Sequence, residues 1–497
     1  MGAPRTAIRS TFGLLPDGPD RLSVWLIWAA GVACAFGLIS GKVDATPQSG
    51  LVFNEMLVRL LHGHFDISPA AIGGEAFVYK GRTYAYFGVF CALLRLPLLL
   101  TGGLGADVTK LSMACAAALS LGARLSAVRL AMTRAQGVSR EVRLIILGAV
   151  AFGGESLQYL RPSIYQEVCC WGAALASVFV LLAVRRTFGR EAKAAPLYAG
   201  MALVAGLALL CRVSFGLGLY AALGLMLCVE AWKRRARLAD LRALAPAALV
   251  LALFAGIAGA VNQARWESPL SFVPVRYQLD LRRLMPDRVY RLDHYGEANL
   301  RRVPFALQYY FAPIWVLRDR QGALLFQQTQ LDLFDSAELP PSSFLLSDPV
   351  VCVLAALGLW ALARRSARIP DASYAAAGVL GLACPAVVML LAISVTFRYR
   401  MDFYPVLDFA ACVGAASLRL DPARQPRRLF LYLTGLGSLV SLFSLMLYCY
   451  APMGPAVDFD MSGGWTTPMW EVAHGRSPFI GHLLPDGRRV NVPIRHN

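Results

Sequence analysis

Charged side chains are scarce in this sequence. Of its 497 residues only 16% are charged, 57% are hydrophobic, and the mean hydropathy is +0.53. A water-soluble chain of this length keeps its apolar residues in a core and covers itself with charge. This chain has too little charge for such a surface, so lipid must be the solvent for much of it.

Paired cysteines and the common catalytic motifs are also missing. The eleven cysteines lie in or at the edges of apolar runs and none forms a CxxC pair, which excludes a disulfide framework and indicates small membrane-buried side chains. There is no Walker loop, no GxSxG and no HExxH, so ATP hydrolysis and serine or zinc protease chemistry have no support. His62, His64 and Asp66 match no established zinc spacing, and solvation at the membrane interface explains them better.

The formal net charge of +17 does not indicate nucleic-acid binding. The arginines cluster in short loops between the apolar runs, and the positive-inside rule accounts for much of this excess. We therefore expect membrane lipids as partners, and no nucleic acid.

The apolar runs predict an all-α polytopic membrane protein with about eleven transmembrane helices. The first run is long enough to span and has no small-residue cleavage site after it, so we interpret it as an anchor helix and not as a signal peptide. Residues 1–450 would form one transmembrane domain, and 451–497 an extracytoplasmic tail. The runs lie near 23–41, 108–131, 141–157, 166–184, 195–211, 213–231, 244–262, 348–363, 372–395, 402–418 and 428–450.

The basic clusters predict the orientation. With the N-terminus inside, every short basic loop falls in the cytoplasm, as the positive-inside rule requires. Segment 88–104 is a twelfth apolar run, but Arg95 and Pro97 interrupt it, and counting it as a span would put the later clusters on the wrong side. We expect N-in, C-out, a bacterial-type inner membrane, and large outer loops at 42–107 and 263–347.

The first outer loop contains several candidate functional residues. Asp44 follows the first span directly, and apolar positions along 51–62 predict a short amphipathic helix that lies at the interface. Glu75 follows, and then Tyr84 and Tyr86 beside a glycine turn. These tyrosines are candidates for a sugar-binding platform, although an interfacial aromatic belt accounts for them about equally well.

A second carboxylate, Glu167, opens a span after the next outer turn. Its position at a helix N-terminus is favoured by the helix dipole, which is reason enough for an acidic residue there. The functional hypothesis is that Glu167 faces Asp44 across a cleft. Two converging carboxylates would supply a general base or a seat for a divalent cation; no cofactor is certain.

Arginines near the outer ends of later spans are candidates for binding a phosphate. Arg398 and Arg400 lie at such an end, and Arg265 follows the seventh span. Two guanidinium groups at the lipid–water boundary could hold a lipid-linked phosphate or diphosphate. The alternative is an arginine–aspartate pair that holds two helices together, because Arg212, Asp402 and Asp408 also lie in or near the apolar zone.

The order of these features resembles the GT-C superfamily, membrane glycosyltransferases that use polyprenyl-phosphate carriers and include protein O-mannosyltransferases and aminoarabinose transferases. The likeness rests on an acidic residue after the first span (Asp44), an interfacial helix ending at Gly63, and a tyrosine-rich stretch at 79–87. It extends to a proline-containing short helix at 95–97, Glu167 at the start of a span, and Arg398-Tyr399 followed by Pro405.

The resemblance implies an inverting transferase that moves a sugar from a polyprenyl-phosphate carrier to a glycan, lipid or protein acceptor on the extracytoplasmic face. It implies that Asp44 is the base, supported by Glu167, and that the arginines bind phosphate. Three alternatives stay open: a transporter or flippase of a lipid-linked or anionic substrate, a polymerase or ligase that uses diphosphate-linked oligosaccharides, and a non-catalytic scaffold.

Overall fold

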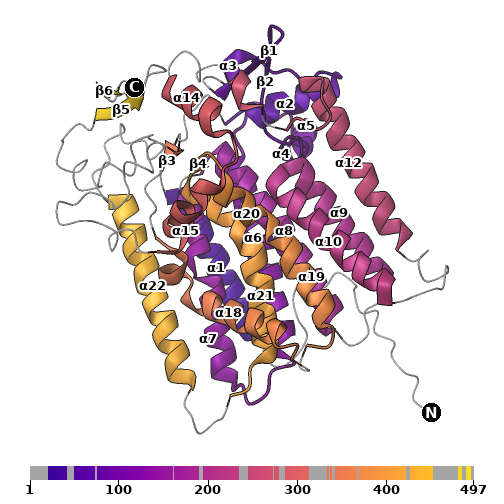
Figure 1. Ribbon diagram of the computed structural model, residues 1–497, viewed down its shortest axis with the longest axis vertical. Helices are drawn as coiled ribbons and strands as arrows, with labels where there is room; N and C mark the ends of the chain where they lie inside the picture. The colour runs from indigo at the N-terminus through magenta and orange to yellow at the C-terminus, as the bar shows by residue number, and fades with distance from the viewer. Residues whose placement is uncertain are drawn as a thin grey trace.

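In the computed structural model the chain forms a bundle of helices with smaller elements at one end (Figure 1). The structure describes residues 21–41, 50–72, 75–160, 162–189, 194–233, 244–272, 274–278, 286–312, 333–334, 336–337, 342–366, 369–420, 426–450, 479–483 and 489–493. The long helices are α1 (Arg21–Gly41), α6 (Thr109–Met132), α8 (Ile164–Phe188), α9 (Ala194–Cys211), α10 (Val213–Lys233), α12 (Ala245–Trp266) and α22 (Pro426–Tyr450).

Shorter helices complete the bundle: α7 (Arg140–Ala151), α18 (Pro349–Ala363), α19 (Ala372–Leu382), α20 (Cys384–Leu391), α21 (Tyr404–Ser417) and the 3-10 helices η2 (Gly154–Leu160) and η6 (Phe397–Phe403). Each of the eleven predicted runs coincides with one of these helices or with a pair of consecutive ones. Among the described residues, seven helical segments are long and apolar enough to cross a membrane: α1, α6, α8, α9, α10, α12 and 372–391. The prediction of an all-α, multi-pass membrane protein is confirmed, while the count of eleven spans and the N-in orientation stay predictions.

The remaining elements connect the helices: α2 (Val52–Leu61), α3 (Pro69–Ile72), β1 (Phe77–Tyr79), β2 (Arg82–Tyr84), α4 (Phe90–Leu93), α5 (Leu96–Thr101), η3 (Val275–Tyr277), α14 (Pro286–Tyr295), η4 (Leu300–Arg302), α15 (Val303–Phe311), β3 (Ser336–Ala337), α17 (Phe344–Ser347), β4 (Ser394–Val395), β5 (Phe479–Leu483) and β6 (Arg489–Pro493). The strands pair in twos, β1 with β2 and β5 with β6 antiparallel, and β3 with β4 parallel.

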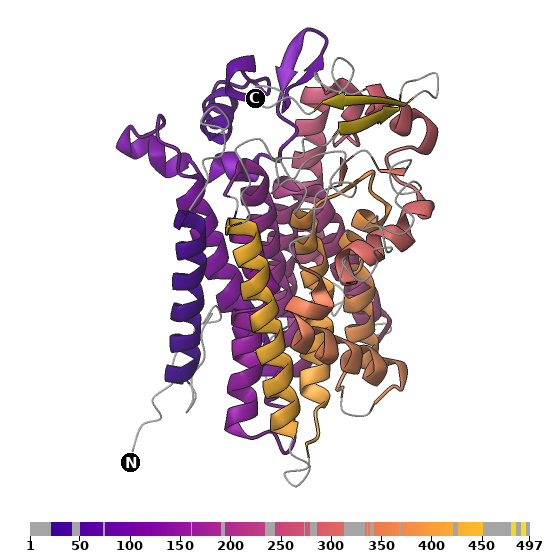
Figure 2. The ribbon, with the colours of Figure 1, turned by 90° about the vertical axis from the view of Figure 1, so that its left-hand side faces the viewer.

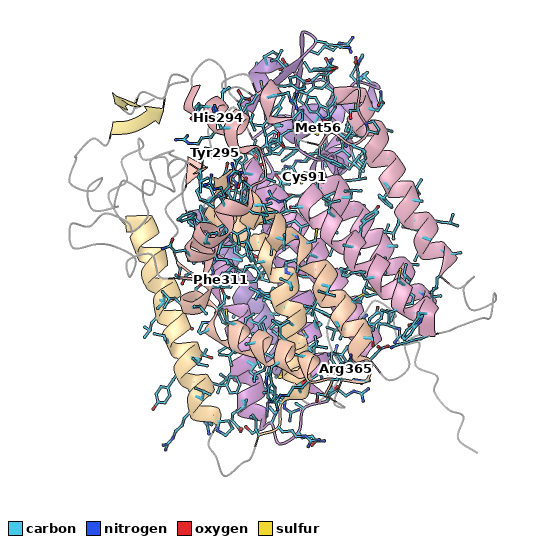
Figure 3. The ribbon with its side chains drawn as sticks, viewed as in Figure 1. Met56, Cys91, His294, Tyr295, Phe311 and Arg365 are labelled. Carbon is cyan, nitrogen blue, oxygen red and sulfur yellow. The ribbon has the colours of Figure 1, made fainter. Side chains whose placement is uncertain are left out.

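The bundle has two chemically different ends. One end, here called the loop end, carries α2, the β1–β2 hairpin and α14, and Met56 and His294 lie there (Figure 3). At the opposite end, here called the basic end, α6, α8, α10 and α18 finish and Arg365 lies (Figures 1 and 3). Described basic residues stand at the ends of these helices, among them Arg129, Arg185, Lys233 and Arg365, so positive charge gathers at the basic end.

Helix α8 is the centre of the bundle. Of its most apolar stretch 89% is buried, against 22% for α1 and 17% for α12. Helix α1 stands at the edge of the bundle (Figure 2), and α12 at another edge beside α9 (Figure 1). The leucines that α12 turns away from the protein, Leu249 and Leu253, are 70% and 59% exposed, as expected for a helix with a lipid-facing side.

The first outer loop folds onto the bundle at the loop end. Helix α2 is amphipathic as predicted, and it buries Phe53, Met56 and Leu57 against the protein. The β1–β2 hairpin turns through Lys80 and Gly81, whose φ angles are 47° and 74°. Two successive positive φ angles are the requirement of the tight two-residue turn that a hairpin favours. Segment 88–104 contains the short helices α4 and α5, in agreement with the prediction of a helix too short to span.

Helices α18 and α21 pack against each other through two glycines. A Cβ atom added at Gly414 would overlap the carbonyl oxygen of Leu354, and one added at Gly358 would overlap that of Ala410. Small residues at such crossings let helix backbones approach closely in a membrane. This contact places the beginning of α21, and with it the preceding η6, against the first turn of α18.

Gly414→Ala is therefore expected to destabilise the protein, by about 1–3 kcal/mol, because the added methyl must separate two packed backbones. Gly224→Ala in α10 is the matched control, since nothing lies within 4 Å of the added Cβ there. Thermal melting in detergent should show a lower Tm for the first variant and an unchanged or slightly higher Tm for the second. Equal Tm values would contradict the close packing of α18 and α21.

Candidate functional site

A cavity of about 250 Å³ lies between the first outer loop and the helix ends nearest to it. Its walls come from segments far apart in the sequence: the stretch after β2, the start of α8, the turn between α9 and α10, the end of α12, α20 and η6. Three arginines line it, Arg212, Arg265 and Arg398, together with three tyrosines, Tyr86, Tyr165 and Tyr399. The rest of the lining is mainly apolar, so the positive groups are concentrated in a water-poor pocket where they act strongly.

Arg265 is the most unusual of these side chains. It lies in the last turn of α12 and is 3% exposed. Its Nη1 donates to the Phe87 carbonyl oxygen at 2.9 Å and its Nη2 contacts the Met56 sulfur at 3.8 Å, while its Nε has no acceptor. Within the part of the chain that the structure describes, no carboxylate pairs with it. A buried guanidinium without an anionic partner is costly, and a bound anion would complete its surroundings.

Arg212 is held rigidly at the turn between α9 and α10. Its Nη2 lies 3.1 Å from Asp402 Oδ2, and its Nε lies 3.1 Å from the Ser214 hydroxyl oxygen. Ser214 in turn donates to Asp402 Oδ1. The Asp402 side chain is completely buried, whereas that of Arg212 keeps 18% exposure. Asp402 thus fixes the guanidinium and leaves one side of it toward the cavity.

Arg398 approaches the cavity from η6. Its guanidinium carbon lies 4.9 Å from the ring centre of Tyr165 and 5.5 Å from that of Tyr399. A guanidinium between two aromatic faces is oriented without losing its hydrogen-bond donors. Arg398 is only half-buried, so it adds a positive group at the more open part of the cavity.

Much of the cavity wall is apolar. It is formed by side chains of α8, α9, α12 and α20, among them Val168, Leu209, Val261 and Val388. Because α12 stands at the edge beside α9 (Figure 1), this wall lies close to the lipid-facing surface. A polar group at the arginines and a hydrocarbon chain along this wall would both find suitable surroundings.

The tyrosines provide hydroxyl groups beside the arginines. Burial raises the pKa of the Tyr86 hydroxyl well above its ordinary value, so Tyr86 stays neutral and can donate a hydrogen bond. Tyr165 lies in the first turn of α8 and lines the cavity. Glu75 accepts from the Gln278 amide at 3.5 Å. Of the residues predicted from the first loop, Tyr86 therefore stands at the cavity.

The predicted site residues do not all meet at the cavity. Tyr86, Arg265 and Arg398 line it, whereas Glu75 does not. Tyr84 does not line it: its ring packs against Trp266, with 5.2 Å between ring centres, in a small aromatic cluster with Phe77. Asp44 lies outside the described residues, so its predicted meeting with Glu167 stays a prediction.

Glu167 is joined to an arginine of the first loop. Arg95 Nη1 and Nη2 donate to its two carboxylate oxygens at 2.6 and 2.8 Å, and Arg95 Nε donates to Asn54 at 3.3 Å. Both side chains are at most 1% exposed. This bidentate pair ties α2 and the segment before α5 to the start of α8. The described residues form no group of three metal-binding side chains, and whether Glu167 shares a cation with Asp44 stays open.

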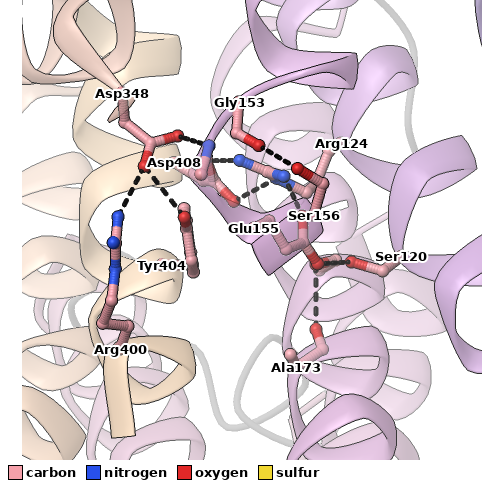
Figure 4. Close-up of polar contacts among 12 residues, drawn as sticks. Ser120, Arg124, Gly153, Glu155, Ser156, Ala173, Asp348, Arg400, Tyr404 and Asp408 are labelled. Carbon is pink, nitrogen blue, oxygen red and sulfur yellow. Dashed lines mark hydrogen bonds and ion pairs between the residues drawn. The ribbon is translucent and has the colours of Figure 1, made fainter. Parts of the chain in front are cut away.

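Arg400 belongs to a buried polar network inside the bundle (Figure 4). Its Nη2 lies 3.0 Å from Asp348 Oδ2, which also accepts from Tyr404 at 3.0 Å, and its Nη1 donates to the Ser342 carbonyl oxygen. The alternative interpretation of the sequence, an arginine–aspartate pair that joins two helices, describes Arg400 well. It is 1% exposed and does not line the cavity.

The same network contains an arginine that the sequence argument did not single out. Arg124 in α6 donates to both carboxylate oxygens of Asp408, at 2.7 and 3.0 Å, and to Glu155. The guanidinium carbon of Arg124 lies 4.9 Å from the ring centre of Tyr404. Because the Tyr404 hydroxyl donates to Asp348, this contact connects the Arg124 group with the Arg400–Asp348 pair. An arginine in the middle of a predicted span is a signal that could have been used, because such a charge has to be paired.

Tyr165 and Tyr399 were also missed as site residues. Both lie beside residues that were predicted, Glu167 and Arg398, but a tyrosine at the outer end of a span is expected as an interfacial anchor whether or not it has a function. Nothing in the local sequence distinguishes the two cases. Only the convergence of α8 and η6 at one cavity does so.

Comparison with known proteins gives distant structural likenesses only. No family model and no curated protein matches the sequence. Among solved structures, the chain is similar to ArnT from Cupriavidus metallidurans bound to undecaprenyl phosphate, with 17% identity, a TM-score of 0.45, and coverage of 91% of this chain and 69% of that one.

It is also similar to the archaeal oligosaccharyltransferase AglB from Archaeoglobus fulgidus in complex with an inhibitory peptide and a dolichol-phosphate. The identity is 12%, the TM-score 0.44, and the match covers 91% of this chain and 55% of that one. Both TM-scores are below 0.5, so neither likeness indicates what this protein binds.

The Arg95–Glu167 pair generates a prediction about its role. Arg95→Met leaves a buried carboxylate without its partner and should destabilise the protein by about 3–5 kcal/mol. Arg95→Met combined with Glu167→Gln removes both charges and should restore part of the loss. Thermal melting of the wild type, both single variants and the double variant measures this. If the double variant is as unstable as the sum of the single variants, the pair does not act as a unit.

Proposed function

We propose that this protein is an integral-membrane glycosyltransferase that moves a sugar from a polyprenyl-phosphate carrier to an acceptor on the extracytoplasmic face. The observation that supports this most directly is the convergence of Arg212, Arg265 and Arg398 on one cavity with an apolar wall. A phosphate attached to a long hydrocarbon chain suits such a cavity, because its anionic group can bind the arginines and its chain can lie along the apolar wall. The order of motifs in the sequence, which resembles the GT-C superfamily, agrees with such a donor.

The arginines would act mainly on the leaving group. When the bond between the sugar and the phosphate breaks, the carrier leaves as a lipid phosphate and its negative charge increases. Prearranged guanidinium groups in a water-poor cavity stabilise charge that develops in this way more than they stabilise the less charged donor. Arg212 is prearranged by Asp402 and Ser214, and Arg265 by the Phe87 carbonyl oxygen.

A base has to accept the proton of the attacking hydroxyl group. The resemblance assigns this role to Asp44 with support from Glu167, and both assignments stay predictions. Glu167 is committed to its bidentate pair with Arg95, which indicates that any support it gives acts through the position of the first loop. Position matters here, because Tyr86 and Phe87 of that loop form part of the cavity.

A transporter is the second candidate, and one observation bears on it. Charged groups inside the bundle are what transport of an anionic substrate would use. Such charges are present as the Arg124–Asp408–Glu155 and Arg400–Asp348 contacts, but their side chains are all less than a tenth exposed and satisfy one another. They describe a structural network better than a path for a substrate.

Arg265→Met tests the proposed phosphate site. Loss of a charge-assisted hydrogen bond of about 1.5–3 kcal/mol should weaken the binding of undecaprenyl phosphate by about 10- to 100-fold. The variant should nevertheless melt at the same or a higher temperature than the wild type, because it removes a buried charge that has no carboxylate partner among the described residues. Arg301→Met, an exposed arginine of the same outer segment, is the matched control and should change neither quantity.

Binding can be measured by native mass spectrometry or a thermal-shift titration with the purified protein in lipid nanodiscs. Unchanged affinity in the Arg265→Met variant would contradict the site. A large fall in Tm without the lipid would indicate that Arg265 serves the fold and not a ligand.

The product of the reaction distinguishes a glycosyltransferase from a transporter. In proteoliposomes with an undecaprenyl-phosphate hexose labelled in the sugar, the wild type should link the label covalently to an acceptor, and Arg265→Met should reduce this at least as strongly as it reduces binding. Movement of intact carrier across the bilayer without a covalent product would favour the transporter. Consumption of a diphosphate-linked oligosaccharide in preference to the monophosphate-linked hexose would favour the polymerase or ligase.

A further inference from the structure

Three consecutive residues at the end of α12 hold the first outer loop in three different ways. Arg265 donates to the backbone carbonyl oxygen of the residue at 87, just after β2. Trp266 packs its ring on Tyr84, with 5.2 Å between ring centres. Glu267 forms an ion pair with Lys80 at the turn of the β1–β2 hairpin. The hairpin and the end of α12 are therefore one connected unit.

The outermost of these contacts is also the easiest to break. The side chains of Lys80 and Glu267 are 62% and 54% exposed, and an ion pair so open to water adds little stability. Both residues have positive φ angles, 47° and 55°, a conformation that glycine adopts at lower cost. This contact, here called the clasp, can open while the helices beneath it stay packed.

The inner part of the same turn lacks hydrogen-bond acceptors. Arg265 Nε and Trp266 Nε1 are buried N–H groups without a partner among the described residues. A buried donor that has no acceptor costs free energy. Because Arg265 lines the cavity, a phosphate bound there would supply an acceptor to its guanidinium. A bound phosphate therefore stabilises the end of α12 in the position that the structure shows.

Helix α12 also stands between the cavity and the lipid. Ala258 and Arg265 line the cavity, whereas Leu253 and Ile257 of the same helix are exposed. Figure 1 shows α12 at the edge of the bundle. A molecule with a long hydrocarbon chain that enters the cavity from the bilayer on this side has to pass α12 or the hairpin bound to its end.

From these contacts we propose that the hairpin and the end of α12 form a gate for the lipid carrier. The clasp between Lys80 and Glu267 opens while the carrier enters beside α12, and binding of the phosphate to Arg265 holds the gate closed. The proposal rests on the proposed function, because it assigns the lipid phosphate to the cavity. Arg265 contacts both the phosphate and the segment after β2, so closure is coupled to occupancy.

Closure of the gate has a chemical use. Tyr86 and Phe87, which follow the hairpin directly, form part of the cavity wall. When the hairpin is held against α12, these rings keep water away from the arginines. A guanidinium group stabilises the charge that develops on a leaving phosphate more strongly in such water-poor surroundings. The open gate admits the carrier, and the closed gate prepares the cavity for reaction.

The test joins the two sides of the clasp covalently in the full-length protein. Lys80→Cys and Glu267→Cys are combined, and the two thiols are linked by a bifunctional thiol reagent whose spacer a reductant cleaves. The matched control combines Lys233→Cys with Asp371→Cys, because these residues form an ion pair of the same kind at the basic end. Wild-type protein treated with the reagent accounts for the native cysteines.

Uptake and release of undecaprenyl phosphate are followed over time by native mass spectrometry of the protein in detergent. Joining the clasp should slow both rates by at least about tenfold, because the gate then cannot open for the carrier. The reductant should restore both rates. The joined control pair and the treated wild type should stay within about twofold of the untreated wild type.

Hydrogen exchange tests the coupling between the phosphate and the gate. Adding undecaprenyl phosphate to the wild type should slow the exchange of amides in β1 and β2, because binding holds the hairpin closed. In Arg265→Met at a saturating concentration of the lipid, the exchange of these amides should stay as in the lipid-free protein. Exchange in α8 serves as the internal reference.

Unchanged rates of uptake and release in the joined protein overturn the proposal, and so does equal exchange of the hairpin with and without the lipid. Slow uptake in the joined control pair also overturns it, since the reagent would then act on the bundle as a whole. In all of these results the wild type still binds the lipid phosphate, so the proposed function survives. If the wild type binds no undecaprenyl phosphate, the proposed function fails and the gate fails with it.

Discussion

A guanidinium group buried among apolar side chains is stable only where an anion or several hydrogen-bond acceptors surround it. This constraint organises the structure. Arg95 meets Glu167, Arg124 meets Asp408 and Glu155, Arg400 meets Asp348, and Arg212 meets Asp402. Each pair joins segments that are far apart in the sequence, so the arginines that make the chain unusual for a membrane protein also connect its helices. Arg265 lacks such a carboxylate among the described residues, and for that reason it indicates a ligand.

The position of the cavity follows from these pairs. Arg95 and Glu167 tie the first outer loop to the start of α8, which brings Tyr86 and Phe87 over the turn between α9 and α10. The buried network and the close contact of α18 with α21 place η6, which carries Arg398, against the same region. Buried arginines therefore have two roles in this fold: most pair with carboxylates and join helices, and one lies at the cavity. The paired arginines hold the helices together, and Arg265, which has no carboxylate partner in the described part of the chain, lines the cavity between them.

Fold class and site were not equally predictable. The helices could be predicted, because an apolar run of sufficient length forms a helix when it spans a bilayer. Each predicted run coincides with helical segments of the structure. The site was predictable in part. Arg265, Arg398 and Tyr86 could be recognised since polar groups at the ends of spans are few. Arg398 and Arg400 are two residues apart and look equivalent in the sequence, yet one lines the cavity and the other is locked to Asp348.

The amino-acid sequence is enough to recognise a multi-pass helical membrane protein, to locate its helices, and to show that its arginines need an explanation. Composition and the length of apolar runs decide those matters locally. Which arginine pairs with which carboxylate follows only from the folded structure, because the partners lie 31 to 284 residues apart and many pairings satisfy the same charges. It also decided that Glu167 is held by Arg95 and does not line the cavity. Side chains meet through the crossing of helices, and that geometry is not contained in any one segment.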